Sequence, residues 1–263
     1  MKSVLITGAA SGIGKAIKDY YLSNGHKVYA LDINKIEDQS NLVSFVADIT
    51  SKDSLEGIKK YLLDNNIELD IIINVAGIHK MASLVENDYN QMKKVIDINL
   101  CGTMLINNVF HDRLVKNGRI IIVTSEVDSF YPMPFNGLYN VSKTALDCYA
   151  QALRQELNLI GQKVITIRPG AIKTPLQTNS ISDTEKLASD TKLFKKESKK
   201  FVTITKKFMG IPLQAEKLAK KIYKVSIKKN PKLSYNIHRN IGLVLLNILP
   251  KRLQCFIIKL ILK

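Results

Sequence analysis

The sequence has few cysteines, and they form no pattern. Cys101, Cys148 and Cys255 are the only three among 263 residues, and they stand far apart. The four histidines show no zinc-binding spacing either. A disulfide framework needs paired cysteines in an oxidising compartment, and a structural zinc site needs closely spaced ligands. We therefore expect a reducing compartment and no structural metal.

Long apolar runs are also missing. No stretch approaches the roughly 18 uninterrupted apolar residues of a membrane span. The first apolar run, residues 3–6, is too short for a signal peptide and leads into Thr7-Gly8 instead of a cleavage site. These absences predict a cytoplasmic protein. The 46% hydrophobic content argues against disorder over most of the chain.

Acidic residues are scarce only in the last third of the chain. Residues 1–185 hold 19 Lys+Arg against 20 Asp+Glu, whereas residues 186–263 hold 20 against 3. The net charge of +16 therefore belongs to the last segment alone. Lysine dominates there, aromatic residues are few and no nucleic-acid recognition motif is present, so we expect no nucleic-acid partner.

What the sequence does hold is a regular alternation of strands and helices. Apolar β-branched runs that follow Gly25, Gly118 and Gly161 predict three strands, and residues 3–6, 42–47 and 69–73 fit three more. Helical patterns lie between them, for example at residues 13–22, 53–63 and 145–159. This order predicts one α/β domain over residues 1–263, with a doubly wound parallel sheet of the Rossmann type.

The polar segment 175–212 interrupts the alternation between Pro175 and Pro212. It follows the C-terminal end of a predicted strand, which is where ligands bind in such sheets. We expect a mobile, partly helical lid over a substrate, and a disordered insert is the alternative.

A glycine-rich turn joins the first predicted strand to the first helix. Gly8 permits the tight turn, Gly12 lets the backbone approach a diphosphate, and Gly14 lets the helix pack against the strand. Asp32 ends the second strand, where a carboxylate accepts hydrogen bonds from ribose hydroxyls and repels a 2′-phosphate. The turn predicts dinucleotide binding, and Asp32 favours NAD over NADP. Lys35 would soften that preference.

The pattern Tyr-x-x-x-Lys occurs twice, at Tyr89/Lys93 and at Tyr139/Lys143, and the composition supplies about one such pair by chance. The second pair opens an Ala- and Leu-rich helix downstream of Ser125, which ends a predicted strand. The first pair has no such serine and is expected to be solvated. A lysine at i+4 lies on the same helical face and favours phenolate, so we expect Lys143 to lower the pKa of Tyr139.

The run Thr-Gly-Ala-Ala-Ser-Gly-Ile-Gly at residues 7–14 resembles the glycine turn of the short-chain dehydrogenase/reductase family. Later landmarks also match, over about residues 3–175. They are Asp48-Ile49, Asn74-Val75-Ala76-Gly77 with Ile73 in place of the family's first Asn, Asn99, Tyr139/Lys143, and Pro169-Gly170 with Thr174.

This resemblance implies two sets of site residues. In the catalytic set Tyr139 exchanges the proton, Ser125 binds the substrate oxygen, Lys143 also holds the nicotinamide ribose, and Asn99 anchors a water that relays protons to Lys143. Asp48 is implied to contact the adenine ring. The implied cofactor-binding residues are Gly8, Ser11, Gly12, Ile13, Gly14, Asp32, Asp48, Ile49, Asn74, Ala76, Gly77, Tyr139, Lys143, Pro169, Gly170, Ile172 and Thr174.

One spacing departs from the family's pattern. Ser125 precedes the tyrosine by 14 residues instead of the usual 13, so the connecting loop carries one extra residue. Glu126 stands at the usual position and is assigned to loop structure or substrate contact, and Ser129 is too close to the tyrosine. The run 134–139 resembles the hydroxysteroid and retinol dehydrogenase-like branch.

We therefore expect an NAD-dependent oxidoreductase that acts on an apolar alcohol or ketone of steroid, retinoid or long-chain type, as a homodimer or homotetramer. The alternatives are a 3-oxoacyl-carrier ketoreductase and a non-catalytic NAD-sensing protein. A hydrolase is excluded because no Gly-x-Ser-x-Gly elbow is present, and His79 is expected at the pocket rim.

The C-terminal segment 241–263 holds two strongly apolar runs, 241–249 and 253–262, around Pro250-Lys251-Arg252. Two such helices either lie in a membrane interface, with the lysines near anionic lipid, or dock onto the domain or a second subunit. Both readings stay open.

Overall fold

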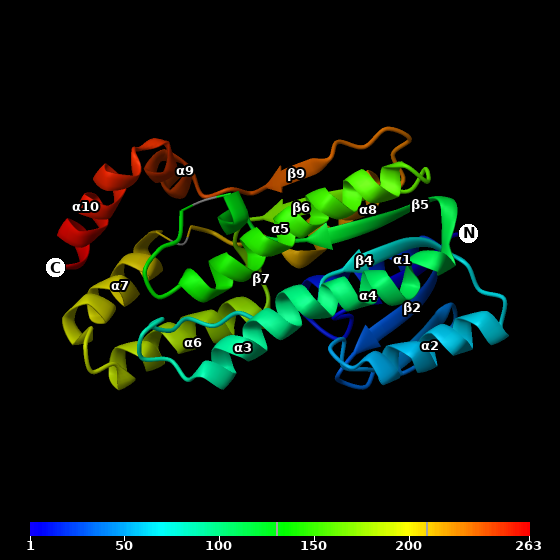
Figure 1. Cartoon of the computed structure of the whole chain (residues 1–263), viewed down its shortest axis with the longest axis horizontal. Coiled ribbons are helices and arrows are strands. Elements are labelled where there is room, and N and C mark those ends of the chain that lie inside the picture. The colour runs from blue at the N-terminus through cyan, green and yellow to red at the C-terminus, as the bar shows by residue number, and fades with distance from the viewer. Residues whose placement is uncertain (130, 209) are drawn as a thin grey trace.

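The computed structural model describes residues 1–129, 131–208 and 210–263. At its centre lies a seven-stranded, all-parallel sheet in the order β3-β2-β1-β4-β5-β6-β9 (Figure 1). The chain adds β2 and β3 on one side of β1, and then returns to add β4, β5, β6 and β9 on the other side. This change in the order of strands is typical of a doubly wound fold. The strands are β1 (Ser3–Thr7), β2 (Lys27–Asp32), β3 (Leu42–Val46), β4 (Leu69–Asn74), β5 (Leu114–Val123), β6 (Lys163–Pro169) and β9 (Ser234–Ile237).

Helices cover both faces of this sheet. On one face α1 (Gly12–Ser23) and α8 (Ala215–Ser226) bury Ile17, Tyr21 and Leu218 against it. On the other face α2 (Lys52–Asp64), α4 (Thr103–Phe110) and α5 (Gly137–Asn158) form a second apolar cluster. The two cores explain why the strands are apolar on both sides, and they confirm the predicted α/β fold.

The remaining elements of the first part connect the sheet to its covering helices. α3 (Tyr89–Ile96) continues through a π-helical segment η1 (Asp97–Gly102) into α4, and a short 3₁₀ segment η2 (His111–Arg113) follows. The predicted helix at residues 145–159 begins earlier, at Gly137, and the strand predicted to reach residue 47 ends at Val46. β9 was not predicted, because its four residues form an edge strand that is only partly buried and carries no apolar run.

Segment 175–212 forms two helices, α6 (Pro175–Asp190) and α7 (Lys195–Phe208). A small parallel pair, β7 (Ile172–Lys173) and β8 (Leu213–Gln214), joins the two ends of the segment at its base. Thr174 caps α6 by accepting a hydrogen bond from the Gln177 amide at 3.4 Å. The segment is thus mainly helical, with both ends tied to the end of the main sheet.

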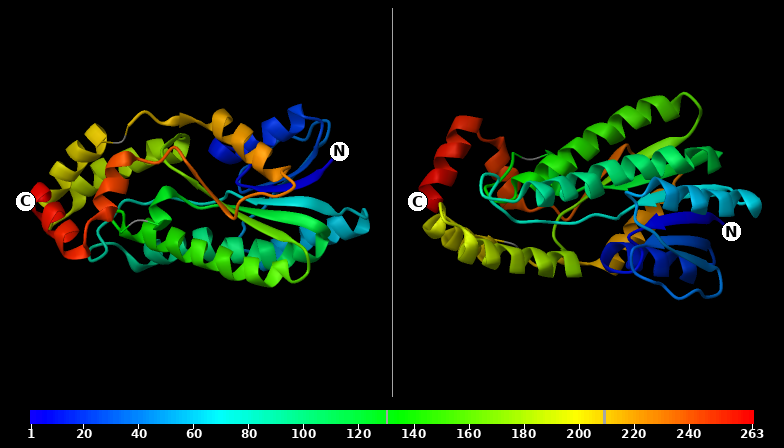
Figure 2. Two further views of the ribbon diagram at one scale, coloured as in Figure 1. Left: turned by 90° about the horizontal axis from the view of Figure 1, so that it is seen from above. Right: turned by 60° about the horizontal axis from the view of Figure 1, so that its bottom comes forward.

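The C-terminal segment consists of α9 (Ile241–Ile248) and α10 (Lys251–Leu262). Leu262 and Ile258 of α10 pack in a third apolar cluster with Phe201 of α7, Phe135 and Met81. Figures 1 and 2 place α7, α9 and α10 together at the end of the molecule opposite the N-terminus. Among the described residues, no helix is both long enough and apolar enough to cross a bilayer.

Candidate active site

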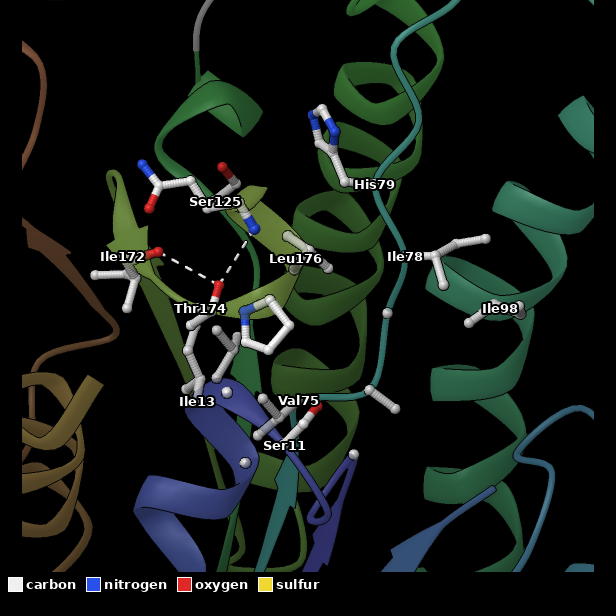
Figure 3. Close-up of a pocket in the computed structure, with 18 of the residues that line it drawn as sticks. Ser11, Ile13, Val75, Ile78, His79, Ile98, Ser125, Ile172, Thr174 and Leu176 are labelled. Carbon is white, nitrogen blue, oxygen red and sulfur yellow. Dashed lines mark hydrogen bonds between the residues drawn. The ribbon is translucent and has the colours of Figure 1, made fainter. Parts of the chain in front are cut away.

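The carboxyl ends of β1, β4, β5 and β6 meet at one cavity of about 490 Å³. Figure 3 shows Ser11 and Ile13 at the glycine turn, Thr174 and Leu176 nearer Ser125, and Ile78 on the opposite side. The sequence-predicted residues that line this cavity are Gly8, Ser11, Gly12, Ile13, Gly14, Asp32, Asp48, Ile49, Ala76, Gly77, Ser125, Tyr139, Lys143, Pro169, Gly170, Ile172 and Thr174.

The glycine turn is shaped by close backbone approaches. Gly8 and Gly12 have φ angles of +68° and +53°, which favour glycine. A Cβ atom on Gly8 would lie 2.9 Å from the Ala76 Cα, and one on Gly14 would lie 2.0 Å from the Gly8 carbonyl oxygen. Helix α1 begins at this turn, so its free N–H groups face the cavity. The turn therefore fits a diphosphate group.

Asp32 lies at the end of β2 and lines the cavity with a nearly buried carboxylate. Its Oδ2 accepts a hydrogen bond from the Ala10 amide at 3.0 Å, and its Oδ1 accepts one from the Asn34 amide at 2.9 Å. Lys35 pairs with Glu37 at 2.9 Å on the surface, and its softening of the preference for NAD stays a prediction. Asp32 therefore presents a fixed carboxyl group to the cavity beside the glycine turn.

The turn after β4 is held by a residue that sequence reasoning missed. The Thr7 hydroxyl accepts hydrogen bonds from the amides of Val75 and Ala76, both at 3.1 Å, and so joins the ends of β1 and β4. Asn74 does not line the cavity, since its side chain donates to Asn107 at 2.8 Å in the interior. Of the predicted cofactor-binding residues, Asn74 alone lies behind the cavity wall.

Ser125, Tyr139 and Lys143 come together although they lie on a strand end and a helix. Ser125 lies near enough to the Tyr139 hydroxyl to oppose the rise of its pKa, and the 3₁₀ segment η3 (Glu126–Ser129) accommodates the longer serine–tyrosine spacing. The Lys143 ammonium donates to the Val123 carbonyl at 3.3 Å and lies 5.9 Å from the centre of the Tyr139 ring. Figure 3 shows Ser125 at the cavity wall.

Burial shifts the pKa of both titratable groups. Burial raises the pKa of Tyr139 to about 12, although the Ser125 hydrogen bond opposes this rise. Burial also lowers the pKa of Lys143 to about 8, and the nearby Asp128 opposes that fall. Burial is thus the largest influence on both groups in the ligand-free protein, and the effect of Lys143 on the pKa of Tyr139 beside a bound dinucleotide stays a prediction.

Asn99 lies in the π-helical segment η1 and is fully buried. Its amide accepts from the Ile78 N–H at 2.7 Å and donates to the Ile78 carbonyl at 2.9 Å and to Ser142 at 3.0 Å. Asn99 thus holds the chain after Gly77 in place beside Lys143 without lining the cavity. Its proton-relay role stays a prediction.

The serine loop rests on two carboxylates. Glu126 accepts a hydrogen bond from the Asn240 amide at 2.7 Å, which assigns it to loop structure. Asp128 is buried, accepts from Thr124, and pairs with Arg168 at 3.1 Å. The sequence offered no signal for Asp128, because an acidic residue in a polar loop is usually solvated. The side chain of Ser129 lies outside the described residues.

His79 lines the cavity, as expected for a rim residue, and its ring centre lies 4.3 Å from that of Tyr139. Burial lowers the pKa of His79 to about 4, so the imidazole is neutral near pH 7. The competing pair is solvated, as predicted. Tyr89 is 70% exposed and Lys93 binds Asp97 at 2.6 Å on the helix surface.

Known proteins resemble this chain in sequence. An uncharacterised oxidoreductase of Staphylococcus epidermidis is 32% identical over 184 residues, which cover 66% of this chain and 80% of that protein. An NADPH-dependent 1-acyldihydroxyacetone phosphate reductase of Schizosaccharomyces pombe is 30% identical over 194 residues. That match covers 71% of this chain and 65% of the relative.

Solved structures share the fold. A short-chain dehydrogenase family protein from Francisella tularensis superposes with a TM-score of 0.76 at 23% identity, over 93% of this chain and 99% of that one. The 3-ketoacyl-(acyl-carrier-protein) reductase of Brucella melitensis, complexed with NADH, gives 0.72 at 21% identity. It covers 90% of this chain and 96% of its own.

The family model described as short chain dehydrogenase matches residues 2–185. This span carries the glycine turn, the serine loop and the Tyr139/Lys143 helix, which are the parts that meet at the cavity. The predicted family resemblance is confirmed, whereas the hydroxysteroid branch stays a prediction. The chain belongs to the short-chain dehydrogenase family and is an oxidoreductase that interconverts alcohol and carbonyl groups with a nicotinamide cofactor.

Proposed function

We propose that this protein is an NAD-dependent dehydrogenase of an apolar alcohol or ketone. One observation carries the proposal: Ser125, Tyr139 and Lys143 line the same cavity as the glycine turn and Asp32. A protein that only senses NAD needs the glycine turn and Asp32, but it has no use for Ser125, Tyr139 and Lys143. The catalytic arrangement therefore favours turnover over simple binding.

The preference for NAD rests on Asp32. The residues that would hold the dinucleotide are Gly8, Gly12 and Gly14 at the diphosphate, and Asp32 at the adenosine ribose. Asp32 is held by two backbone amides, so it cannot swing away to admit a 2′-phosphate. The fission yeast relative is named for NADPH, so cofactor choice within the family has to be measured for this chain.

When bound, the nicotinamide supplies or accepts the hydride. Ser125 holds the substrate oxygen and the Tyr139 hydroxyl moves the proton at that oxygen. With a pKa near 12, Tyr139 is protonated at neutral pH and is ready to donate to a carbonyl oxygen. Alcohol oxidation needs the phenolate, so its rate should rise with pH, about tenfold per unit while the phenolate fraction limits it.

An apolar substrate is supported by apolar side chains in the cavity wall. Ile78, Ile98 and Leu176 line the cavity, and His79 is neutral. Leu176 and Ser180 come from α6, which supports segment 175–212 as a substrate lid. These features favour a steroid, retinoid or long-chain substrate. Reduction of an acylated ketone is the second candidate, favoured by the similarity to the acyldihydroxyacetone phosphate reductase.

We place the protein in the cytoplasm as a homodimer or homotetramer, since the family often forms oligomers. Peripheral contact of residues 241–263 with a membrane stays a prediction from the sequence. Three free cysteines, all exposed, are compatible with a reducing compartment.

The test is a panel of alcohols and ketones of rising chain length, assayed with NAD(H) and NADP(H). We expect kcat/KM to rise with chain length and to favour NAD. Asp32→Ser should remove most of that cofactor preference while leaving kcat with NAD within a few-fold. A native preference for NADP would contradict the cofactor assignment. A preference for short, polar alcohols would contradict the substrate class.

A further inference from the structure

The two C-terminal helices present apolar side chains to the outside. On α9, Ile241, Leu245 and Ile248 are 74%, 61% and 73% exposed, and their spacing of four and three residues places them on one face. None of the α9 residues is buried. The eight-residue helix α9 therefore has an apolar stripe that faces away from the protein.

Helix α10 repeats this pattern on a fixed support. Leu253, Phe256 and Leu260 are 44%, 61% and 69% exposed, again with helical spacing. The opposite face carries Gln254 and Leu262, which are buried. Leu262 packs with Phe201 of α7 in the third apolar cluster, so α10 already has its protein contact on one side. The outward stripe therefore stays largely exposed to solvent after α10 has docked onto the described part of the chain.

The surroundings of this stripe are strongly basic. After Glu216 the chain has no Asp or Glu up to its last residue, whereas residues 217–263 contain 12 Lys or Arg. On the tail itself Lys251, Arg252, Lys259 and Lys263 are exposed. The neighbouring α7 carries one acidic residue, Glu197, and adds five exposed lysines, Lys195, Lys196, Lys199, Lys200 and Lys207. A partner for this end of the molecule must combine an apolar layer with negative charge.

We propose that α9 and α10 form a docking surface for an anionic lipid bilayer. Helices of 8 and 12 residues are too short to span the hydrocarbon core, but their apolar stripes fit the boundary between headgroups and acyl chains. The flanking lysines then lie at the level of the headgroups and are attracted to negative lipid.

A second copy of the chain is a poorer partner for this surface. A symmetric contact would bring two identical basic patches together, because the same residues face each other across a two-fold axis. The attraction between apolar stripes would then be opposed by repulsion between like charges, which an anionic bilayer replaces with attraction. Nucleic acid offers the negative charge but no apolar layer for Phe256 and Leu260.

Vesicle flotation with the full-length protein tests the proposal. Vesicles of phosphatidylcholine alone are compared with vesicles that also contain phosphatidylglycerol. The double variant Phe256→Glu with Leu260→Glu changes the docking surface. The matched control, Leu159→Glu with Ile160→Glu, changes two residues that are 86% and 56% exposed. They lie between α5 and β6, before the amino ends of the parallel strands, whereas α9 follows the carboxyl end of β9.

We expect the wild type and the control to float with anionic vesicles, to float less with phosphatidylcholine alone, and to be released by salt. The tail variant should bind anionic vesicles about tenfold more weakly or worse. If it fails to fold, as judged by its thermal transition, Ile248→Glu alone must still weaken binding. Flotation does not depend on turnover, so this result stands apart from the proposed reaction.

Three results would overturn the proposal. The wild type fails to float with either kind of vesicle, or the tail variant floats as well as the wild type. Alternatively, light scattering shows that the tail variant loses an oligomer that the wild type forms without lipid, which would assign the stripe to contact between copies of the chain.

Discussion

Residues 1–174 and residues 175–263 differ in how their structure is determined. The first part is nearly neutral, and its strands are buried between two helical layers. The second part is strongly basic. Its α8 and β9 belong to the main core, whereas α9 and α10 pack on one side at most. The packing of a buried strand is determined by its own chain, because both of its faces are covered. A half-covered helix leaves part of its surface free to contact a partner. Most residues of the site come from the first part, whereas the second part adds residues of α6, among them Leu176 and Ser180, to the cavity wall.

The largest effect should come from the glycine turn. Gly14→Ala places a Cβ 2.0 Å from the Gly8 carbonyl oxygen, where backbone has to move. We expect a loss of roughly 4 kcal/mol or more in the free energy of unfolding, together with loss of NAD binding. Gly57→Ala on α2 is the matched control, since nothing lies within 4 Å of the new methyl group. It should stabilise the helix by about 0.5–1 kcal/mol. Equal effects in urea unfolding would refute the close packing of the turn.

Lys143→Met should stabilise the ligand-free protein while abolishing turnover. Burial lowers the pKa of Lys143 from 10.5 to about 8, so the charged amine costs the folded state on the order of 3 kcal/mol below pH 8. Between pH 8 and about 10.5 the unfolded chain binds the proton and the folded chain does not. Wild-type stability therefore rises with pH through that window, and the advantage of the variant shrinks. A variant that is less stable than the wild type at pH 7 would contradict this account.

A smaller effect should come from weakening the contact between α7 and α10. Leu262→Ala removes a side chain packed against Phe201, whereas Leu260→Ala changes one that is 69% exposed. We expect the first to weaken the α7–α10 contact by about 2 kcal/mol and to speed amide hydrogen exchange in α7, with β4 and β5 unaffected. Faster exchange in the core strands would mean that the two parts of the molecule unfold together.

The smallest effect should come from the second Tyr-x-x-x-Lys pair. Lys93 binds Asp97 on the surface of α3 and faces solvent. Lys93→Ala should leave the midpoint of urea unfolding and the turnover rate unchanged, because exposed ion pairs contribute little. A marked loss of turnover would show that Tyr89/Lys93 has been wrongly set aside.

The same division explains what could be predicted from the sequence. Local sequence was enough to predict the parallel sheet, the glycine turn and the choice of Tyr139 over Tyr89. Each depends on features that the residues themselves show, such as apolar runs and glycines where φ is positive. β9 could not be predicted in this way, since it is a short edge strand without an apolar run. The Asp128–Arg168 pair could not be predicted either, because it joins residues 40 positions apart.

The electrostatics of the site were also beyond sequence reasoning. The i+4 spacing correctly placed Lys143 near Tyr139 on one helix, but the sign of the pKa shift depends on how deeply both groups are buried. That depth follows from the packing of β5, β6 and α5, and no spacing encodes it. For the tail, the apolar runs predicted two helices and left their partner open, because an apolar stripe does not show what covers it.

The central claim is that Tyr139 moves the proton in the reaction, and the most direct test compares Tyr139→Phe with Tyr89→Phe. Each variant removes one phenol oxygen from a Tyr-x-x-x-Lys pair. Turnover of the best substrate with NAD should fall at least about a hundredfold in Tyr139→Phe and remain at the wild-type level in Tyr89→Phe, with NADH affinity kept in both. Full turnover in Tyr139→Phe would contradict the account.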